Sequence, residues 1–254
     1  MTSALVLADF SQLTEDNDRS YAPATDTLQS WTPAGKPRYT MSGSAAVVSV
    51  RGSYPGQADG AFQMTFEPGG GLKVAFNLAW QGSARSPRQI GVVFSLPGGV
   101  DYLSWKRRGQ FSYYSPSDIG RNVGTDVRPG ACGTYFGFSG DACGYSPATL
   151  WSHDSTPMGS NDFRSTKDAI LGYSLCAQPE GRQCVRLVSN GTANGQPGTL
   201  SARSWLNGSS VKLLAATLSN EGGNSFTQPV AVLPHVNLAP GSPVAGEVQL
   251  QVAE

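Results

Sequence analysis

The chain has 254 residues, 14% of them charged, and its formal net charge at pH 7 is zero. This length fits one large all-β domain and can bury a sizeable core. The lack of a basic excess argues against nucleic acid and anionic membranes as partners, because both attract clustered lysine and arginine. There is no run of 18 apolar residues, so the sequence predicts no transmembrane helix.

The first 40 residues are expected to form an irregular segment that packs on the domain that follows. Polar and turn residues dominate them, and Trp31 and Tyr39 stand as isolated aromatic anchors. The first ten residues lack a basic region, and their apolar run is too short for a signal peptide. A secreted type of cysteine pattern without a signal peptide predicts that this chain is a piece of a longer exported protein. The initial Met is then interpreted as an addition to that piece.

Strand patterns follow. Residues 45–50 form a short apolar run. Two alternating runs then flank a Gly-rich turn at 67–71, and they contain Phe62, Met64, Phe66 and Leu72, Val74, Phe76, Leu78. Two alternating runs across such a turn indicate a β-hairpin. Residues 90–96 are continuously apolar, which predicts a strand covered on both faces.

Residues 101–128 form the most polar and aromatic stretch of the chain. Gly109, Pro116 and Gly120 interrupt it, so it is expected to be a long, shaped loop. Such loops often carry function. Its aromatic and charged side chains are Trp105, Lys106, Arg107, Arg108, Phe111, Tyr113, Tyr114, Asp118 and Arg121.

Four cysteines form two local pairs, Cys132 with Cys143 and Cys176 with Cys184. An even count at short spacing predicts disulfides and an oxidising compartment. Free thiols are a second interpretation, and a four-cysteine zinc site is a third. The zinc site lacks the two-residue gap within each pair that such sites prefer.

The second half adds further strands. Residues 169–175 and 185–189 flank a turn at 178–182, and a Cys176–Cys184 disulfide would close this hairpin. Residues 211–218, 230–236 and 247–252 follow, the last with Val248, Leu250 and Val252 directed inward. We find no convincing amphipathic helix longer than two turns. The sequence therefore predicts an all-β fold of two packed sheets with more than ten strands, in which residues 41–254 form one domain.

Two motifs carry a family resemblance. After the apolar strand come Trp105, Arg107 or Arg108, Gly109, Phe111, Tyr114, Pro116, Asp118, Ile119, Gly120, Arg121, Gly124 and Thr125. Residues 161–167 read Asn-Asp-Phe-Arg-Ser-Thr-Lys. Together with 60–78 and 88–91, these segments resemble the C-terminal β-sandwich domain of glycoside hydrolase family 2, the β-galactosidase-like proteins. The resemblance spans roughly residues 60–250.

The resemblance implies a large two-sheet sandwich, the supersandwich of galactose-mutarotase-like type. In that family the domain follows the catalytic barrel, packs on it and does not hold the two catalytic carboxylates. This chain departs from the pattern in one motif position, because Asp118 adjoins Ile119 where the family has an intervening His. The cysteine-bearing insertions are also unusual for the family.

A carbohydrate site is one interpretation of these motifs. Sugars bind aromatic platforms and planar polar groups that hydrogen-bond neighbouring hydroxyls. The candidate carbohydrate-binding residues are Trp105, Arg107, Tyr113, Tyr114, Asp118, Arg121, Asn161, Asp162 and Arg164. The alternative is structural: Trp105 belongs to the core, and the charged residues pin the loops together.

Catalysis by this chain alone finds little support. Glycosidases need two carboxylates across a cleft, and the glutamates fall mostly in predicted turns, on a strand's outer face or at the terminus. Mutarotase-type chemistry needs a histidine with a carboxylate, and the chain has only His153 and His235. A Ca²⁺ site near Asp141, His153 and Asp154 lacks any ion-specific spacing, so no cofactor is expected.

The sequence thus leads to a non-catalytic accessory domain of a secreted or periplasmic glycoside hydrolase. Its expected partners are a poly- or oligosaccharide and the catalytic domain of the parent enzyme. The alternatives are a free-standing sandwich-fold enzyme of epimerase or lyase type, with His153 or His235 facing a carboxylate, and a protein-interaction module with an exposed apolar patch.

Overall fold

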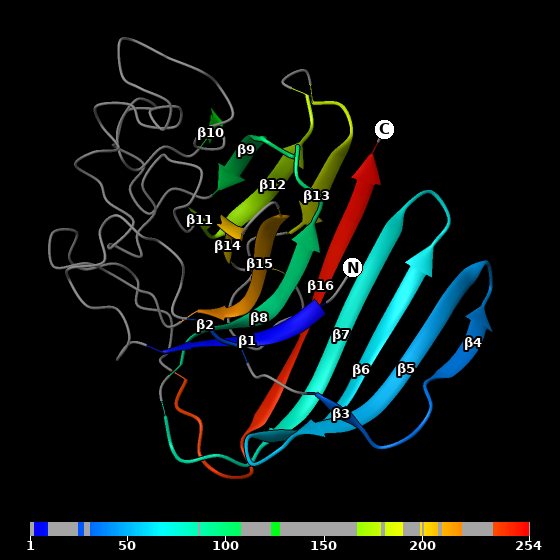
Figure 1. The fold of residues 1–254 in the computed structure, drawn as a ribbon, viewed down its shortest axis with the longest axis vertical. Helices are drawn as coiled ribbons and strands as arrows, with labels where there is room; N and C mark the ends of the chain where they lie inside the picture. Colours follow the sequence, from blue (N-terminus) through cyan, green and yellow to red (C-terminus); the bar gives the residue numbers. More distant parts are fainter. Residues whose placement is uncertain are drawn as a thin grey trace, which may run out of the picture.

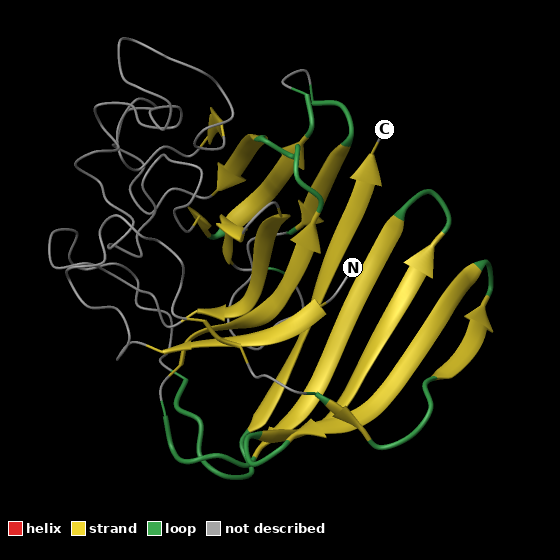
Figure 2. Ribbon diagram, viewed as in Figure 1, coloured by secondary structure: helices red, strands yellow, loops and turns green. Residues whose placement is uncertain are grey.

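The computed structural model describes residues 3–9, 25–27, 31–85, 87–107, 123–127, 167–178, 181–189, 199, 201–207, 210–219 and 236–253. In these residues every regular element is a β-strand, and the strands form two antiparallel sheets (Figure 2). The predicted all-β, two-sheet fold is confirmed, with sixteen strands in the described part of the chain. None of the described segments is a helix long and apolar enough to cross a membrane.

The six-stranded sheet contains the N-terminal strand (Figure 1). Its order is β11 (Lys167–Asp168), β14 (Ser201–Asn207), β15 (Ser210–Ser219), β8 (Pro87–Leu96), β1 (Ser3–Asp9) and β2 (Thr25–Thr27). The ten-stranded sheet has the order β10 (Val123–Val127), β9 (Tyr102–Arg107), β12 (Ile170–Cys176), β13 (Cys184–Val188), β16 (Pro243–Ala253), β7 (Gly71–Trp80), β6 (Ala58–Glu67), β5 (Ala45–Tyr54) and β3 (Thr32–Pro33), and β4 (Arg38–Ser42) also pairs with β5.

Two strand predictions from the first half are confirmed. β6 and β7 form the expected hairpin, and its turn uses Gly69 and Gly70 at φ of 84° and 90°, which glycine adopts without steric cost. β8 contains the continuous apolar run. Val92, Val93 and Phe94 alternate between its two faces, yet each is at most 5% exposed, so β8 is covered on both sides.

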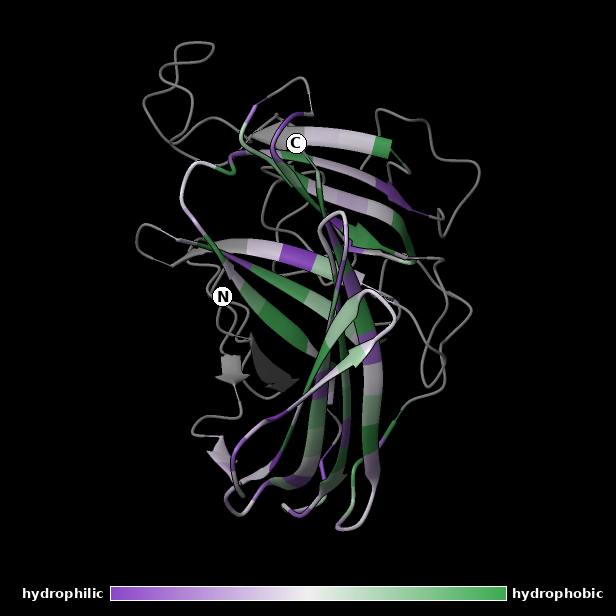
Figure 3. Ribbon diagram, turned by 90° about the vertical axis from the view of Figure 1, so that its right-hand side faces the viewer, coloured by the Kyte–Doolittle hydropathy of each residue, from purple (hydrophilic) through white to green (hydrophobic). Residues whose placement is uncertain are grey.

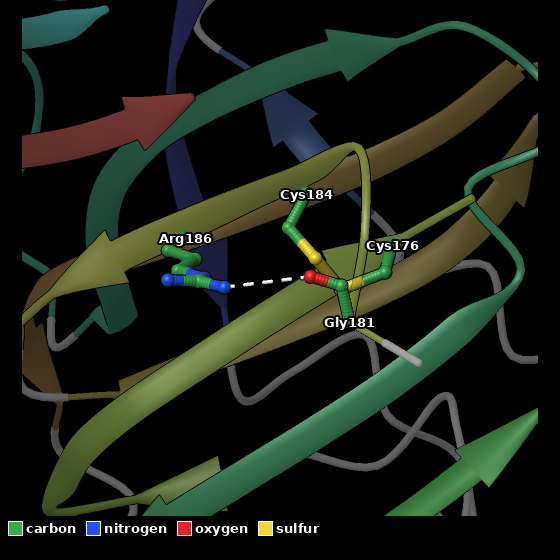
Figure 4. Close-up of a disulfide and its surroundings, with 4 residues drawn as sticks. All are labelled: Cys176, Gly181, Cys184 and Arg186. Carbon is green, nitrogen blue, oxygen red and sulfur yellow. Dashed lines mark hydrogen bonds between the residues drawn. A yellow bond between two sulfur atoms is a disulfide. The ribbon is translucent and has the colours of Figure 1, made fainter. Parts of the chain in front are cut away.

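The predicted disulfide hairpin is also confirmed. β12 and β13 pair antiparallel, and Cys176 is bonded to Cys184 at the turn end of the hairpin, where the connecting segment begins and ends (Figure 4). The Arg186 guanidinium donates a hydrogen bond of 3.5 Å to the carbonyl oxygen of Gly181 in the connecting turn. This disulfide indicates a non-cytoplasmic location. Cys132 and Cys143 lie outside the described residues, so their pairing stays a prediction.

The N-terminal segment differs from the expectation. Residues 1–40 were expected to be irregular, but they contribute β1, β2, β3 and the start of β4. β1 lies inside the six-stranded sheet between β8 and β2. The run Ser3–Asp9 gives little local evidence of a strand, because no short turn joins it to either partner and its longest pairing is with β8, about 80 to 90 residues later in the chain.

The core lies between the two sheets. Its largest side chains come from both sheets and include Trp80, Phe94, Leu96, Leu103, Trp105 and Tyr173. Val248 and Leu250 of β16 are 1% exposed and face this core as predicted, but Val252, predicted to be inward too, is 48% exposed. Of the predicted strand at 230–236, only Val236 is described; it lies outside any strand and packs against the core.

One row of paired residues shows how far the core extends. Directly opposed residues of antiparallel strands share a face. The row runs across the ten-stranded sheet through Gly124, Trp105, Tyr173, Leu187, Leu250, Leu72, Phe66, Ala46 and Met41. It is buried from Gly124 to Leu72 and then becomes exposed, at 46% for Phe66 and 57% for Met41.

The exposed end of this row belongs to β4, β5 and β6, which we call the wing. In Figure 1 these three strands extend to the right, away from the strands of the six-stranded sheet. The inner face of the wing is therefore the same face that elsewhere forms the core, but at Tyr39, Met41 and Phe66 it is exposed to solvent.

Candidate functional site

The predicted carbohydrate residues divide into two groups. Trp105 and Arg107 lie on β9 and are described. The other seven lie outside the described residues, and for them carbohydrate contact stays a prediction: Tyr113, Tyr114, Asp118, Arg121, Asn161, Asp162 and Arg164. Arg108, His153 and His235 are outside the described residues as well.

Trp105 is a core residue. It is 3% exposed and pairs with Gly124 on one side and Tyr173 on the other. Gly124 allows this packing, since a methyl group there would lie only 2.6 Å from Cε2 and Cη2 of the indole ring. A ring buried in this way has no open face for a sugar to stack on. Direct sugar contact by Trp105 is therefore unsupported, and the structural alternative is favoured.

The two sequence motifs meet at this ring. Lys167, the last residue of the Asn-Asp-Phe-Arg-Ser-Thr-Lys element, forms β11 at the edge of the six-stranded sheet. Its Nζ lies 4.6 Å from the centroid of the Trp105 ring, and the side chain is fully buried. Such a desolvated cation–π contact contributes roughly 2 kcal/mol. The motifs thus join the two sheets to each other.

A hydrogen bond crosses between the sheets beside this contact. The Tyr173 hydroxyl on β12 donates to Oγ of Ser204 on β14 at 2.9 Å, and both residues are at most 1% exposed. Arg107, 5% exposed, follows Trp105 on the same face of β9. We call Trp105, Arg107, Lys167, Tyr173 and Ser204 the intersheet cluster. Burial of Arg107 also leaves its predicted sugar contact unsupported.

The chemistry of the intersheet cluster is cationic and aromatic. Apart from two hydroxyl groups, its polar groups are the ammonium of Lys167, the guanidinium of Arg107 and the indole N–H of Trp105. Each of these three residues has a further interaction partner. Among the side chains that the structure describes, no carboxylate is buried. No group of three metal-binding side chains occurs in those residues either. The cluster is therefore suited to holding the sheets together.

The other notable surface is on the wing. On its inner face lie Tyr39, Met41, Ala46, Val48, Met64 and Phe66, which we call the wing face. Tyr39 is 65% exposed, Met41 57% and Phe66 46%. With side-chain areas of roughly 200 Å² each, these fractions amount to roughly 300 Å² of exposed apolar surface.

The wing face carries few polar groups. The Tyr39 hydroxyl is the one polar side-chain group of the wing face, and it donates a hydrogen bond to Sδ of Met41 at 3.0 Å within that face. An ion pair beside the wing, between Lys73 of β7 and Glu247 of β16 at 3.4 Å, is formed on the opposite, polar face of the sheet. Farther along the same face of β5 and β6, Tyr54 and Phe62 contact the Trp31 ring edge-on, each at a centroid distance of 5.0 Å.

Part of this surface is predictable from the sequence. The alternation of Phe62, Met64 and Phe66 correctly placed these residues on one face, and Tyr39 was singled out as an aromatic anchor. Their exposure had no local signal, because it depends on where the second sheet ends.

Comparisons with known proteins add a likeness of fold only. No protein-family model matches the chain, and no curated protein matches it in sequence. A putative aldose 1-epimerase from Escherichia coli K12 is similar in structure, with a TM-score of 0.39 and 9% identity over 86% of this chain and 68% of that chain. A galactose mutarotase related enzyme from Lactobacillus acidophilus has a TM-score of 0.36 and 8% identity over 87% of this chain and 72% of that chain. Likenesses of this size carry no inference about activity.

Proposed function

We propose that the chain is a non-catalytic accessory β-sandwich domain of an exported carbohydrate-active protein. Its wing face packs on a companion domain of that protein. The observation that carries the proposal is the uncovered apolar surface formed by Tyr39, Met41 and Phe66. The parent class comes from the resemblance of the motifs at 105–125 and 161–167 to glycoside hydrolase family 2.

The energetics favour a covered wing face. Removing roughly 300 Å² of apolar surface from water is worth about 7 kcal/mol before the costs of association are subtracted. A patch of roughly 300 Å² is as large as the largest apolar patch of many monomers, and such patches are often functional. The Cys176–Cys184 disulfide fits an exported protein, because such bonds persist in oxidising compartments.

The test measures complex formation between this chain and the catalytic domain of its parent protein, supplied as a separate polypeptide. Sedimentation velocity is expected to show a complex that Tyr39→Ser combined with Phe66→Ser weakens at least tenfold. Val123→Ser is the matched control, because Val123 is 59% exposed on β10, at the other end of the same sheet. Equal binding by the unsubstituted chain, the double variant and Val123→Ser would refute the packing role, and so would the absence of any complex.

A second candidate function is polysaccharide binding by the same surface. It is favoured by two exposed aromatic rings, Tyr39 and Phe66, on one sheet face. Affinity electrophoresis against a panel of galactans, xylans and glucans would reveal it as retardation that Tyr39→Ala abolishes. It is the less favoured candidate, because the wing face offers few groups to hydrogen-bond sugar hydroxyls.

The enzyme alternative is tested with the same preparation. Polarimetry of freshly dissolved α-galactose, and ultraviolet absorbance with uronic-acid polymers, would detect epimerase and lyase turnover respectively. Turnover that disappears when His153 and His235 are substituted would replace the accessory-domain proposal.

A further inference from the structure

The outer edge of the wing is a strand with one free side. In the described part of the chain β4 pairs with β5 alone, and all five of its residues are exposed. Figure 3 is turned so that this side of the molecule faces the viewer. A strand at a sheet edge presents a row of main-chain N–H and C=O groups that another strand can pair with. The edge of β4 is thus a template for strand addition.

We propose that a second copy of this chain occupies that edge, with the two β4 strands paired antiparallel about a twofold axis at Thr40. In this register all five residues find a partner. Thr40 lies opposite Thr40 of the second copy, Tyr39 opposite Met41 and Arg38 opposite Ser42. Thr–Thr pairs are favourable cross-strand neighbours, and a thioether beside an aromatic ring is favourable as well.

Two unfavourable contacts that it avoids distinguish this register from its neighbours. A shift that centres the pair on Arg38 would place two guanidinium groups opposite each other, and like charges in that position are destabilising. A shift by a single residue in the pairing would place Tyr39 and Met41 on the polar face of the other copy. The register at Thr40 avoids both problems. The formal net charge of zero adds no repulsion between two copies.

Pairing of the edges continues the wing face from one copy to the next. The rows Tyr39–Val48–Met64 and Met41–Ala46–Phe66 of one copy would meet the corresponding rows of the other. The area is small, since it consists of one five-residue strand and two side chains on each side. Interfaces below about 1,200 Å² in total are typical of weak association, so we expect a Kd of roughly 10 µM to 1 mM.

Self-association at the edge does not depend on the proposed function. A companion domain would cover the wing face, whereas the second copy pairs with the edge. Phe66 lies two strands inward from that edge, so Phe66→Ser is expected to weaken companion binding and to leave self-association unchanged.

The experiment is a charge-swap test of the 254-residue chain by sedimentation equilibrium between about 10 µM and 1 mM. Thr40→Lys and Thr40→Glu should each be monomeric at every concentration, because like charges then face each other at the twofold axis. An equimolar mixture of the two variants should restore association, at least as strong as that of the unsubstituted chain. Gln63→Lys is the control and should associate normally, because Gln63 is exposed on the same polar face of β6, away from the edge.

Three results would overturn the proposal. They are a monomer at every concentration for the unsubstituted chain, undiminished association of Thr40→Lys, and no recovery in the mixture. Far-ultraviolet circular dichroism of each variant establishes that it is folded, which is expected because Thr40 is exposed.

Discussion

The packing of Trp105 on Gly124 gives the sharpest test of the intersheet cluster. Carbon atoms in van der Waals contact are separated by about 3.5–4.0 Å. A methyl group on Gly124 would strike Cζ2 of the Trp105 ring and would also lie 2.6 Å from Cε2 and Cη2, so ring and strand would have to separate by more than about 1 Å. The ring is 3% exposed and has Lys167 against it, which leaves little room to move. Overpacking of this kind costs about 1–3 kcal/mol, and we expect Gly124→Ala to fall in the upper half of that range.

A second glycine provides the control. Gly172 lies on β12, the other neighbour of β9, and a methyl group there would meet nothing within 4 Å. Gly172→Ala should therefore change the free energy of unfolding by no more than about 0.5 kcal/mol. Both variants are alanines in strands that pair with β9, so the comparison isolates the contact with the indole ring.

The assay is guanidinium chloride unfolding followed by far-ultraviolet circular dichroism, with equal slopes required for a comparison of stabilities. Trp105→Phe removes the ring carbons that the new methyl group would strike. In that background Gly124→Ala should cost at least 1 kcal/mol less than in the unsubstituted chain, which is the signature of a direct contact. If both alanine variants lost the same stability, or Gly124→Ala lost none, the argument that glycine is required here would be wrong.

Three further predictions concern neighbouring contacts. Tyr173→Phe should lower the free energy of unfolding by about 1–2 kcal/mol, because it removes a hydrogen bond between two buried side chains of opposite sheets; urea unfolding checks this. Replacing Cys176 and Cys184 by serine should cost about 2.5 kcal/mol, the loop-closure value for a sequence separation of 8, measured without reductant. Lys73→Ala should change stability by less than about 0.5 kcal/mol, because its ion pair with Glu247 is only partly buried and is screened by solvent; a loss above 1 kcal/mol would contradict this.

Local patterns predicted the parts of the fold that are held by local pairing. The β6–β7 hairpin and the disulfide hairpin connect strands through short turns, so alternation and spacing were sufficient to identify them. Continuous apolarity was sufficient for β8, because a strand covered on both faces needs no polar side. β1 was missed because no short turn joins it to either of its partners, β2 and β8.

The candidate site was less predictable. Lysine is rarely fully buried, so nothing local indicated that Lys167 lies against Trp105 in the core. Val252 and Phe66 follow correct inward patterns yet are exposed, because a strand's alternation defines its faces but not the extent of the opposing sheet. The wing face is therefore visible only once the two sheets are assembled.

The position of β16 has a consequence for how the molecule acquires its structure. This strand of 11 residues lies between β13 and β7, and its pairing brings Gln251 opposite Gly71. Without it, the larger sheet is two separate pieces: β9, β10, β12 and β13 on one side, and β3 to β7 on the other. The hairpins within each piece can form early from short loops, whereas their union needs a contact across most of the chain, which is intrinsically slow. Until β16 pairs, β7 and β13 present unpaired main-chain N–H and C=O groups at their edges, so we expect aggregation to compete most strongly with folding at this stage.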